Sequence, residues 1–264
     1  MVERADYLLN SGAIGKRLGR KYGVTPDIHV DDYVFADIYA RSGQNLEASL
    51  DAYLDRGKVD AEKIRDLIAD LQGARISEGK LPESMALLDF ASGYGCVARH
   101  FKNVAPNGKI VAIDIHDKAM YFNIAHLGIQ AAVSDMDPLQ VNPFFQFDVV
   151  FCLSFFSHQP RHRIGPWLDM LTRFVKVGGI LLFTAHGATT HRDHLAHLRP
   201  DADGYAFEKT SEQKDLSLDD YGNAITYPKF MFREINQIPG IELVLFRSAA
   251  WRTHQDLYVL RKIA

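Results

Sequence analysis

Between residues 85 and 184, short apolar runs alternate with segments whose apolar residues recur at helical spacing. The runs are nearly continuous, as in Asp148-Val-Val-Phe-Cys-Leu153, which is typical of parallel strands buried on both faces. Strands and helices in alternation predict a right-handed, doubly wound α/β sheet. Further along the chain, Tyr227-Pro228 predicts the start of a helix, and two closing strands are predicted at residues 241–247 and 256–262.

The region from residue 31 to residue 73 is predicted to be helical. Asn45 can cap one helix and Asp60 the next, while Gly57 and Gly73 stand where C-terminal caps belong. In the second helix, apolar residues recur at i, i+3, i+4 and i+7, namely Ile64, Leu67, Ile68 and Leu71. The pattern predicts a helical N-terminal extension over residues 1–80, ahead of a main domain over residues 81–264.

A glycine-rich loop follows the first predicted strand of the sheet. The strand ends in Asp89, Gly93 and Gly95 open the loop, and a helix is predicted from Cys96 to Phe101. Glycines let the backbone pass close to a ligand, and the free N–H groups of a following helix would face it. Ligands of open α/β sheets bind at the carboxyl ends of the strands, where Asp89 lies. The loop is therefore the first candidate for a binding site.

Two cofactor classes fit this loop in part. Gly93-x-Gly95-x-x-Ala98, with Asp114 roughly 20 residues further on, satisfies the dinucleotide fingerprint. A dinucleotide, however, places a pyrophosphate at the loop, and the carboxylate of Asp89 would repel that anion. Asp89 suits a ligand that carries a cationic amino group, and S-adenosylmethionine is such a ligand. It has an ammonium, a sulfonium and a ribose, and no phosphate.

The order Asp89-x-Ala91-x-Gly93-x-Gly95 resembles the first motif of the class I S-adenosylmethionine-dependent methyltransferases. Four later segments resemble further motifs of that family in the same order: 108–116, 129–136, 147–154 and 175–184. The resemblance covers residues 85–186 well and the tail moderately. It implies a doubly wound, mostly parallel seven-stranded sheet that ends in an antiparallel hairpin, with S-adenosyl-L-methionine as the cofactor.

The resemblance also implies roles for single residues. Asp114 would hold the ribose hydroxyls, Ile115 would pack on the adenine, and Asp135 would approach the adenine amino group. Asp89 and the glycine loop would hold the methionine end of the cofactor. The cofactor-binding set carried over from the family is Asp89, Ala91, Ser92, Gly93, Gly95, Asp114, Ile115, Asp135, Met136, Leu153 and Ser154.

The loop after the fourth strand is where this family acts on its acceptor. It reads Leu153-Ser-Phe-Phe-Ser-His158-Gln-Pro160 and lacks the Asn/Asp-Pro-Pro-Tyr/Phe signature of enzymes that methylate exocyclic nitrogens. It is more similar to the loops of small-molecule methyltransferases. His158 is the first candidate for a catalytic base, because an unperturbed histidine titrates near neutral pH. A structural histidine that holds the loop is an equally weighted alternative. His186, after the fifth strand, is the second candidate.

A polar, histidine-rich stretch at about 187–226 has little periodicity and is long for a connection, so we interpret it as a lid insertion. Its histidines at 191, 194 and 197 would share one face of a helix, but no second ligand cluster accompanies them, and no metal is expected. The turn Trp251-x-x-His254-Gln255-Asp256 resembles a turn of bacterial glycan or secondary-metabolite methyltransferases. Contact with the acceptor and local turn hydrogen bonding both remain open there, with the turn chemistry slightly favoured.

Composition narrows the choice of partner and compartment. The chain has 264 residues, a net charge of −3 and a pI near 6.4, which argues against a general nucleic-acid surface. A short basic patch, Lys16, Arg17, Arg20 and Lys21, is interpreted as part of a solvated arm over residues 1–30, with a partner-binding site as the less favoured alternative. No apolar run approaches the ~20 residues of a membrane span, no secretory signal is present, and Cys96 and Cys152 lack metal spacing. These features predict a cytoplasmic protein with reduced thiols.

Together, these patterns and the resemblance predict an enzyme that transfers a methyl group from S-adenosylmethionine to a small-molecule or glycan acceptor, at oxygen. Two alternatives stay open: an NAD(P)-dependent oxidoreductase, which Asp89 and the closing strands disfavour, and a non-catalytic protein that binds S-adenosylmethionine. Neither nucleic acid nor a membrane is an expected partner. The oligomeric state does not follow from the sequence, and a homodimer is one option.

Overall fold

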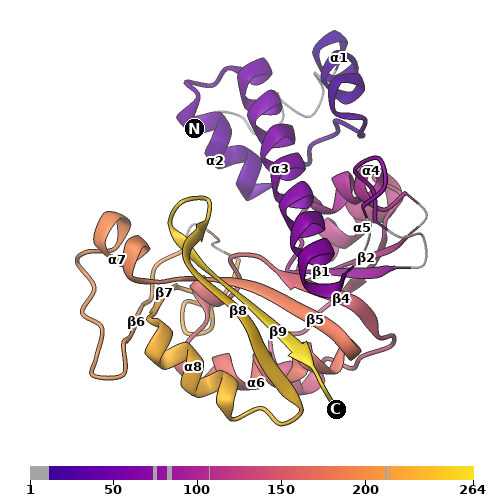
Figure 1. Ribbon diagram of the computed structural model, residues 1–264. Coiled ribbons are helices and arrows are strands. Elements are labelled where there is room, and N and C mark those ends of the chain that lie inside the picture. Colours follow the sequence, from indigo (N-terminus) through magenta and orange to yellow (C-terminus); the bar gives the residue numbers. More distant parts are fainter. Residues whose placement is uncertain (1–11, 74–75, 82–84, 107, 212, 214) are drawn as a thin grey trace. The chain divides into compact units, whose positions relative to one another are not determined.

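The computed structural model describes residues 12–73, 76–81, 85–106, 108–211, 213 and 215–264 (Figure 1). The chain forms two compact units, Met1–Ser134 and Asp135–Ala264. The division between a helical extension and a main domain near residue 80 stays a prediction. In the part of the chain that the structure describes, no helix has the length and apolar character that crossing a membrane requires.

Seven strands make up the sheet, in the order β3-β2-β1-β4-β5-β9-β8. The first unit contributes β1 (Ala86–Phe90), β2 (Lys109–Asp114) and β3 (Gln130–Val133). These three strands pair in parallel, with Phe90 opposite Ile113 at the carboxyl ends of β1 and β2. Every residue of β1 is buried, the acid Asp89 included, as expected for a strand covered on both faces.

The second unit contributes β4 (Phe147–Cys152), β5 (Val175–His186), β8 (Ile241–Trp251) and β9 (Gln255–Lys262). β4 and β5 are parallel, whereas β9 runs antiparallel to both β5 and β8. Figure 1 shows β8 and β9 as the long closing hairpin of the chain. The predicted fold class, a mostly parallel seven-stranded α/β sheet with a C-terminal antiparallel hairpin, is confirmed.

Among the described residues before β1, the chain forms three helices: α1 (Ala13–Tyr22), α2 (Tyr33–Arg41) and α3 (Leu46–Gln72). The side chain of Asn45 accepts a hydrogen bond from the N–H of Ala48 at 3.0 Å, so Asn45 caps α3 as predicted. Gly73 ends α3 in the left-handed conformation, also as predicted.

The predicted break between two helices at Gly57 and Asp60 is wrong, because α3 runs without interruption for 27 residues. Asp60 lies on the buried face of α3 and is only 4% exposed. A Cβ at position 57 would overlap the carbonyl group of Cys96, so this glycine lets the helix pack closely on the loop after β1. The glycine at position 57 is therefore explained by close packing against the loop and not by the end of a helix.

The solvated arm predicted for residues 1–30 is corrected by α1. Residues 1–11 lie outside the described residues, but residues 13–22 form a helix whose Leu18 and Tyr22 are buried in a cluster with Phe35, Tyr53 and Leu54. The basic side chains of this region therefore project from an anchored helix. Burial of the two apolar side chains explains why the helix forms despite its glycines.

The segment after the glycine loop also differs from its prediction. Residues 94–97 form turns, a 3-10 helix η1 (Ala98–His100) follows, and α4 (Phe101–Val104) is short. Gly93 and Gly95 both have positive φ, which winds the chain into turns before helical geometry can begin. The helix dipole expected behind the loop is therefore small.

In the second unit, α6 (Arg161–Arg173) connects β4 to β5, and α8 (Pro228–Asn236) begins after Tyr227, as predicted. The polar stretch after β5 contains α7 (Ala188–His194) and a small antiparallel sheet of β6 (Tyr205–Glu208) and β7 (Asn223–Thr226). The insertion therefore has regular structure, although its role as a lid stays a prediction.

Candidate functional site

The glycine loop after β1 has an unusual backbone. Gly93 and Gly95 have φ of 52° and 71°, and Ala91, which has a side chain, has φ of 59°. The left-handed conformation costs a non-glycine residue about 1–2 kcal/mol, and such strain gathers at ligand sites. A Cβ on Gly93 would meet no atom within 4 Å, so open space lies against the loop there. This loop can receive a ligand close to its backbone.

Asp114, at the end of β2, is tied to this loop. Its Oδ2 accepts the N–H of Gly93 at 2.8 Å, and its Oδ1 accepts the backbone N–H of His116 at 3.0 Å. The Nδ1 of His116 lies 2.8 Å from the same Oδ1. The carboxylate is 7% exposed and is thus fixed at the carboxyl edge of the sheet. Ile115, the next residue, is half-buried beside it.

Asp89 is a buried acid at the end of β1, with 4% of its surface exposed. Burial raises the pKa of Asp89 well above its ordinary value, and the negative charges of Asp114 and Asp60 raise it further. A hydrogen bond from the backbone of Ala98 opposes these effects on the pKa. A neighbouring cation would lower the pKa of Asp89 and stabilise its carboxylate form.

Arg99 is a buried side chain that holds the glycine loop and that sequence reasoning missed. Its guanidinium donates to the carbonyls of Tyr94 and Gly95, both at 3.0 Å, and to those of Thr25 and Asp27 at 3.0 and 2.9 Å. One side chain thereby joins the loop to the segment before α2. No local pattern marks such a residue, because its partners are backbone groups far apart in the sequence.

The second unit contains the remaining predicted binding residues. Asp135 is exposed and Met136 half-buried, with the carbonyl of Met136 accepting from Arg163 at 2.7 Å. Leu153 and Ser154 follow β4 and are half-buried. Ser154 has φ of 60°. Its N–H donates to Thr184 Oγ1 at 2.8 Å, so the end of β5 holds this bend in place.

His158 is anchored to the insertion. Its Nδ1 donates to the carbonyl of Gly222 at 2.8 Å, and the N–H of Gly222 donates to the carbonyl of His158 at 3.0 Å. The ring also stacks on Tyr221, with centroids 4.6 Å apart. These contacts support the structural alternative for His158, because they fix the loop after β4 against the insertion.

His186, at the end of β5, lies beside His158, with ring centroids 5.9 Å apart. Burial lowers the pKa of His186 to about 3, and the neighbouring rings of His158 and His254 lower it as well. A hydrogen bond with the backbone of Ala224 partly opposes the shift. Among the described residues, no group hydrogen-bonds to its buried Nδ1. His186 is therefore a neutral imidazole near pH 7, and its Nδ1 is buried without a hydrogen-bond partner among the described residues.

The histidines of the insertion point to different partners. His191 contacts Tyr227 Oη at 2.7 Å, and His197 contacts Glu208 at 2.9 Å. His194 instead packs against the ring of His254. In the described ranges, no three side chains of His, Cys, Asp or Glu gather as a metal site.

The hairpin turn combines local and long-range hydrogen bonds. His254 Nδ1 donates to the carbonyl of Arg252 at 2.7 Å, which is turn chemistry. Gln255 reaches Ser154 on the loop after β4, with its Nε2 2.9 Å from Oγ. Asp256 accepts from the N–H of Ala249 at 2.8 Å through Oδ1, whereas no described residue hydrogen-bonds to its buried Oδ2. The sequence pattern identified this turn, and the structure shows which side chain reaches the loop after β4.

Comparison with known proteins adds to this geometry. Residues 88–181 match the family model described as a methyltransferase domain. The matched range begins in β1, includes the glycine loop and Asp114, and ends within β5. No curated protein sequence matches the chain.

Many solved structures share the fold. An S-adenosylmethionine-dependent methyltransferase from Clostridium acetobutylicum aligns with a TM-score of 0.56 and 12% identity over 87% of this chain and 98% of its own. DesVI from Streptomyces venezuelae aligns with a TM-score of 0.57 and 16% identity over 86% and 98% of the two chains. Magnesium protoporphyrin IX methyltransferase from Synechocystis, with bound SAH, aligns with a TM-score of 0.53 and 11% identity over 98% and 100%.

At these identities the structural likeness establishes the fold alone. Residues 88–181 therefore match the model of a methyltransferase domain, and the chain has the fold of the class I S-adenosylmethionine-dependent methyltransferases.

Proposed function

We propose that this S-adenosylmethionine-dependent methyltransferase transfers its methyl group to an oxygen atom of a small molecule or glycan. The observation that carries the cofactor assignment is the pair of fixed carboxylates at the carboxyl ends of β1 and β2, Asp89 and Asp114. The choice of a small-molecule or glycan oxygen rests on the resemblance of the loop after β4, and the unpartnered, buried Nδ1 of His186 supports a polar contact near that loop.

The residues of the glycine loop fit the cofactor. Asp89 would face the ammonium group, because a cation removes the electrostatic cost of ionising this buried carboxyl. Asp114 would accept hydrogen bonds from the ribose hydroxyls, and Ile115 would pack against the adenine. The open space beside Gly93 leaves room for a ligand against the backbone. Asp135, Met136, Leu153 and Ser154 complete the proposed binding set.

When bound, the cofactor supplies an electrophilic methyl group on a sulfonium. The chain must position the acceptor oxygen in line with that group and exclude water, and alignment can contribute up to about 7–11 kcal/mol in favourable cases. His186 would accept a hydrogen bond from the acceptor hydroxyl through Nδ1 and take its proton as the new bond forms. With a pKa of about 3, His186 is a weak base, so alignment has to provide most of the rate.

His158 would also have a positioning role. Its Nδ1 is committed to the carbonyl of Gly222, and its ring is stacked on Tyr221. Through these contacts it holds the loop after β4, which carries Leu153 and Ser154. We keep both His158 and His186 as candidate bases, because an Nδ1–H that donates to a carbonyl leaves Nε2 as the ring nitrogen without a proton.

The test of the cofactor is calorimetric titration of the full chain with S-adenosylmethionine, S-adenosylhomocysteine and NAD. We expect the first two to bind with micromolar affinity and NAD not to bind. Binding of NAD alone would overturn the proposal and favour the oxidoreductase alternative.

Turnover separates an enzyme from a non-catalytic binding protein. A panel of sugars and phenols, incubated with S-adenosylmethionine, should yield S-adenosylhomocysteine with at least one member. Methylation at nitrogen or carbon of the product, determined by mass spectrometry and NMR, would contradict the assignment of oxygen as the acceptor atom.

A further inference from the structure

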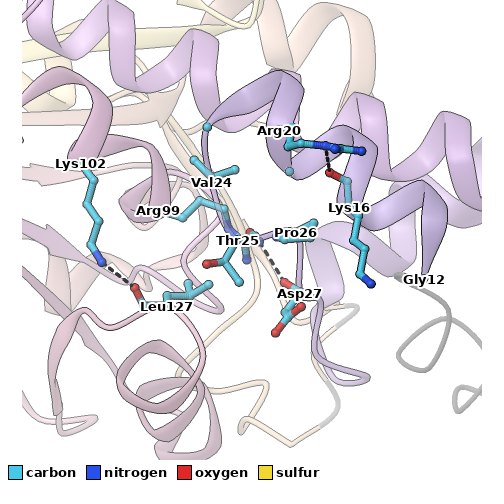
Figure 2. Close-up of a pocket in the computed structure, with 12 residues that line it drawn as sticks. Gly12, Lys16, Arg20, Val24, Thr25, Pro26, Asp27, Arg99, Lys102 and Leu127 are labelled. Atoms are coloured by element: carbon cyan, nitrogen blue, oxygen red, sulfur yellow. Dashed lines mark hydrogen bonds between the residues drawn. The ribbon is translucent and has the colours of Figure 1, made fainter.

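A large open pocket lies in the first unit, behind the glycine loop. Its volume is about 890 Å³, and its lining comes from α1, the segment 23–27, Arg99, Lys102 and Leu127 (Figure 2). This size is within the ~300–1,000 Å³ range of small-molecule sites. None of the predicted cofactor-binding residues lines the pocket, so it is separate from the cofactor loop.

The pocket is strongly basic although the whole chain carries a net charge of −3. Lys16, Arg20, Arg99 and Lys102 line it, and Asp27 is the one acid among the lining residues. Figure 2 shows Lys16 and Lys102 on opposite sides of the central segment, with Arg99 between them. The cations are thus spread across the pocket rather than gathered at one point.

In the part of the chain that the structure describes, none of these four cations is paired with a carboxylate. Arg20 Nε donates to the carbonyl of Lys16 at 3.3 Å, and Lys102 Nζ donates to the carbonyl of Leu127 at 3.1 Å. Arg99 is occupied by backbone carbonyls, and Asp27 lies 3.3 Å from His126.

The other two cations of α1 behave differently. Arg17 pairs with Glu47 at 2.5 Å, and Lys21 pairs with Asp51 at 2.7 Å, both on α3. The helix therefore presents two neutralised cations to α3 and two without a carboxylate partner to the pocket. Unpaired cations lining one concave surface repel one another and attract a multiply charged anion.

The walls of the pocket are built closely. A Cβ on Gly19 would lie 2.9 Å from the carbonyl of Val24 and 3.1 Å from Pro26, so the glycine lets α1 approach this segment. Val24, Pro26 and Leu127 supply apolar surface beside the cations. A ligand with both charged and apolar parts matches this lining.

We propose that this pocket binds a small molecule bearing two or more phosphate groups. Arg20 would pair with phosphate oxygens through its guanidinium, and Lys16 and Lys102 would supply point charges on the two sides. Arg99, whose side chain both lines the pocket and holds the carbonyls of Tyr94 and Gly95, links the pocket to the glycine loop. Binding at this pocket is proposed independently of which molecule accepts the methyl group.

Calorimetric titration of the full chain with inorganic pyrophosphate tests this proposal, with citrate as a carboxylate anion of similar charge. We expect pyrophosphate to bind more tightly than citrate, with an affinity that falls as salt is raised. The double variant Lys16→Ala/Arg20→Ala should weaken pyrophosphate binding by about tenfold or more, since two charge-assisted contacts are lost.

The matched control is Arg17→Ala/Lys21→Ala, which also removes two positive charges from α1 but leaves the residues that line the pocket unchanged. This control should bind pyrophosphate within about twofold of the unaltered chain, because it loses only the non-specific electrostatic attraction of two surface charges. Circular dichroism checks that both variants fold. Equal weakening in the two variants, tighter binding of citrate, or no binding of pyrophosphate would each overturn the proposal. So would a short RNA that binds more tightly than pyrophosphate and competes with it.

Discussion

At the scale of single residues, Asp114 carries the clearest expectation. Asp114→Ala should weaken S-adenosylhomocysteine binding by about 1–3 kcal/mol, because charge-assisted hydrogen bonds to the ribose are left unmade. Titration calorimetry measures the change. Asp117→Ala is the control, since Asp117 is an exposed acid only three positions further on. An unchanged affinity in the Asp114 variant would refute the ribose assignment.

His186 is expected to act on turnover and not on cofactor affinity. His186→Ala should lower kcat by about 10²-fold, the lower end of the range for a general base, because its pKa of about 3 makes it a weak base. The measurement uses a sugar or phenol that the acceptor panel identifies. His194→Ala, on the exposed side of α7, should leave kcat unchanged.

The pH profile gives a second measurement of the same residue. Since the pKa of His186 is about 3, this imidazole stays neutral from about pH 8 down to about pH 5. Turnover should therefore not fall with an apparent pKa near 6.5 through protonation of this base. If His186→Ala kept the same kcat as His194→Ala, His186 would have no role in the reaction.

Asp60 makes stability depend on pH. Burial raises the pKa of Asp60 to about 7, while Arg56 and Lys63 lower it in part. Between its ordinary value of 3.8 and about 7, the folded chain holds a proton that the unfolded chain has released, so stability falls as pH rises through this window. In Asp60→Asn no carboxyl titrates at this position, so this fall in stability is absent. The stability of the variant relative to the unaltered chain should therefore rise as pH is raised from about 5 to about 8.

Chemical denaturation at several pH values tests the expectation for Asp60. Asp70→Asn, an exposed change on the same helix, should follow the unaltered chain at every pH. If the stability of Asp60→Asn showed the same pH dependence as that of the unaltered chain, the carboxyl of Asp60 would not be the group that titrates.

At the scale of elements, α3 depends on Gly57. In an isolated helix, alanine is more stable than glycine by about 1 kcal/mol. Here the added methyl group would overlap the carbonyl of Cys96, so Gly57→Ala should instead destabilise the protein by about 1–3 kcal/mol. Thermal unfolding measures this. Val59→Ala, an exposed change on α3, should leave stability nearly unchanged, and a more stable Gly57 variant would contradict the packing argument.

Elements also show where sequence patterns reach their limit. The parallel strands and the closing hairpin of the seven-stranded sheet follow from apolar patterns, because burial on both faces requires continuous apolar runs, whereas β6 and β7 of the insertion were not predicted. The two-helix prediction for α3 failed because glycine and aspartate, which are common at helix ends, also occur where a helix packs closely or buries an acid. Only the neighbouring loop distinguishes the two causes.

At the scale of the whole molecule, the cofactor should stabilise the fold. A ligand that binds only the folded chain adds about 2.7 kcal/mol to its stability when present at 100 times its Kd. S-adenosylhomocysteine should therefore raise the Tm in a dose-dependent way, whereas NAD should not. Scanning calorimetry provides the measurement, and Asp114→Ala should need more ligand for the same rise. A Tm that NAD alone raises would contradict the cofactor assignment.

The sequence by itself determined the succession of the strands in the seven-stranded sheet and the glycine loop with its two acids. These features are local, since apolar periodicity and short motifs record the demands of burial and of a nearby ligand. Only the tertiary structure decided that His158 is anchored to Gly222, that Nδ1 of His186 is buried without a partner among the described residues, and that Arg99 holds the glycine loop. It also decided that Lys16 and Arg20 face a pocket while Arg17 and Lys21 pair with α3. The physical reason is that hydrogen-bond partners and counterions come from residues far along the chain, which no local pattern records.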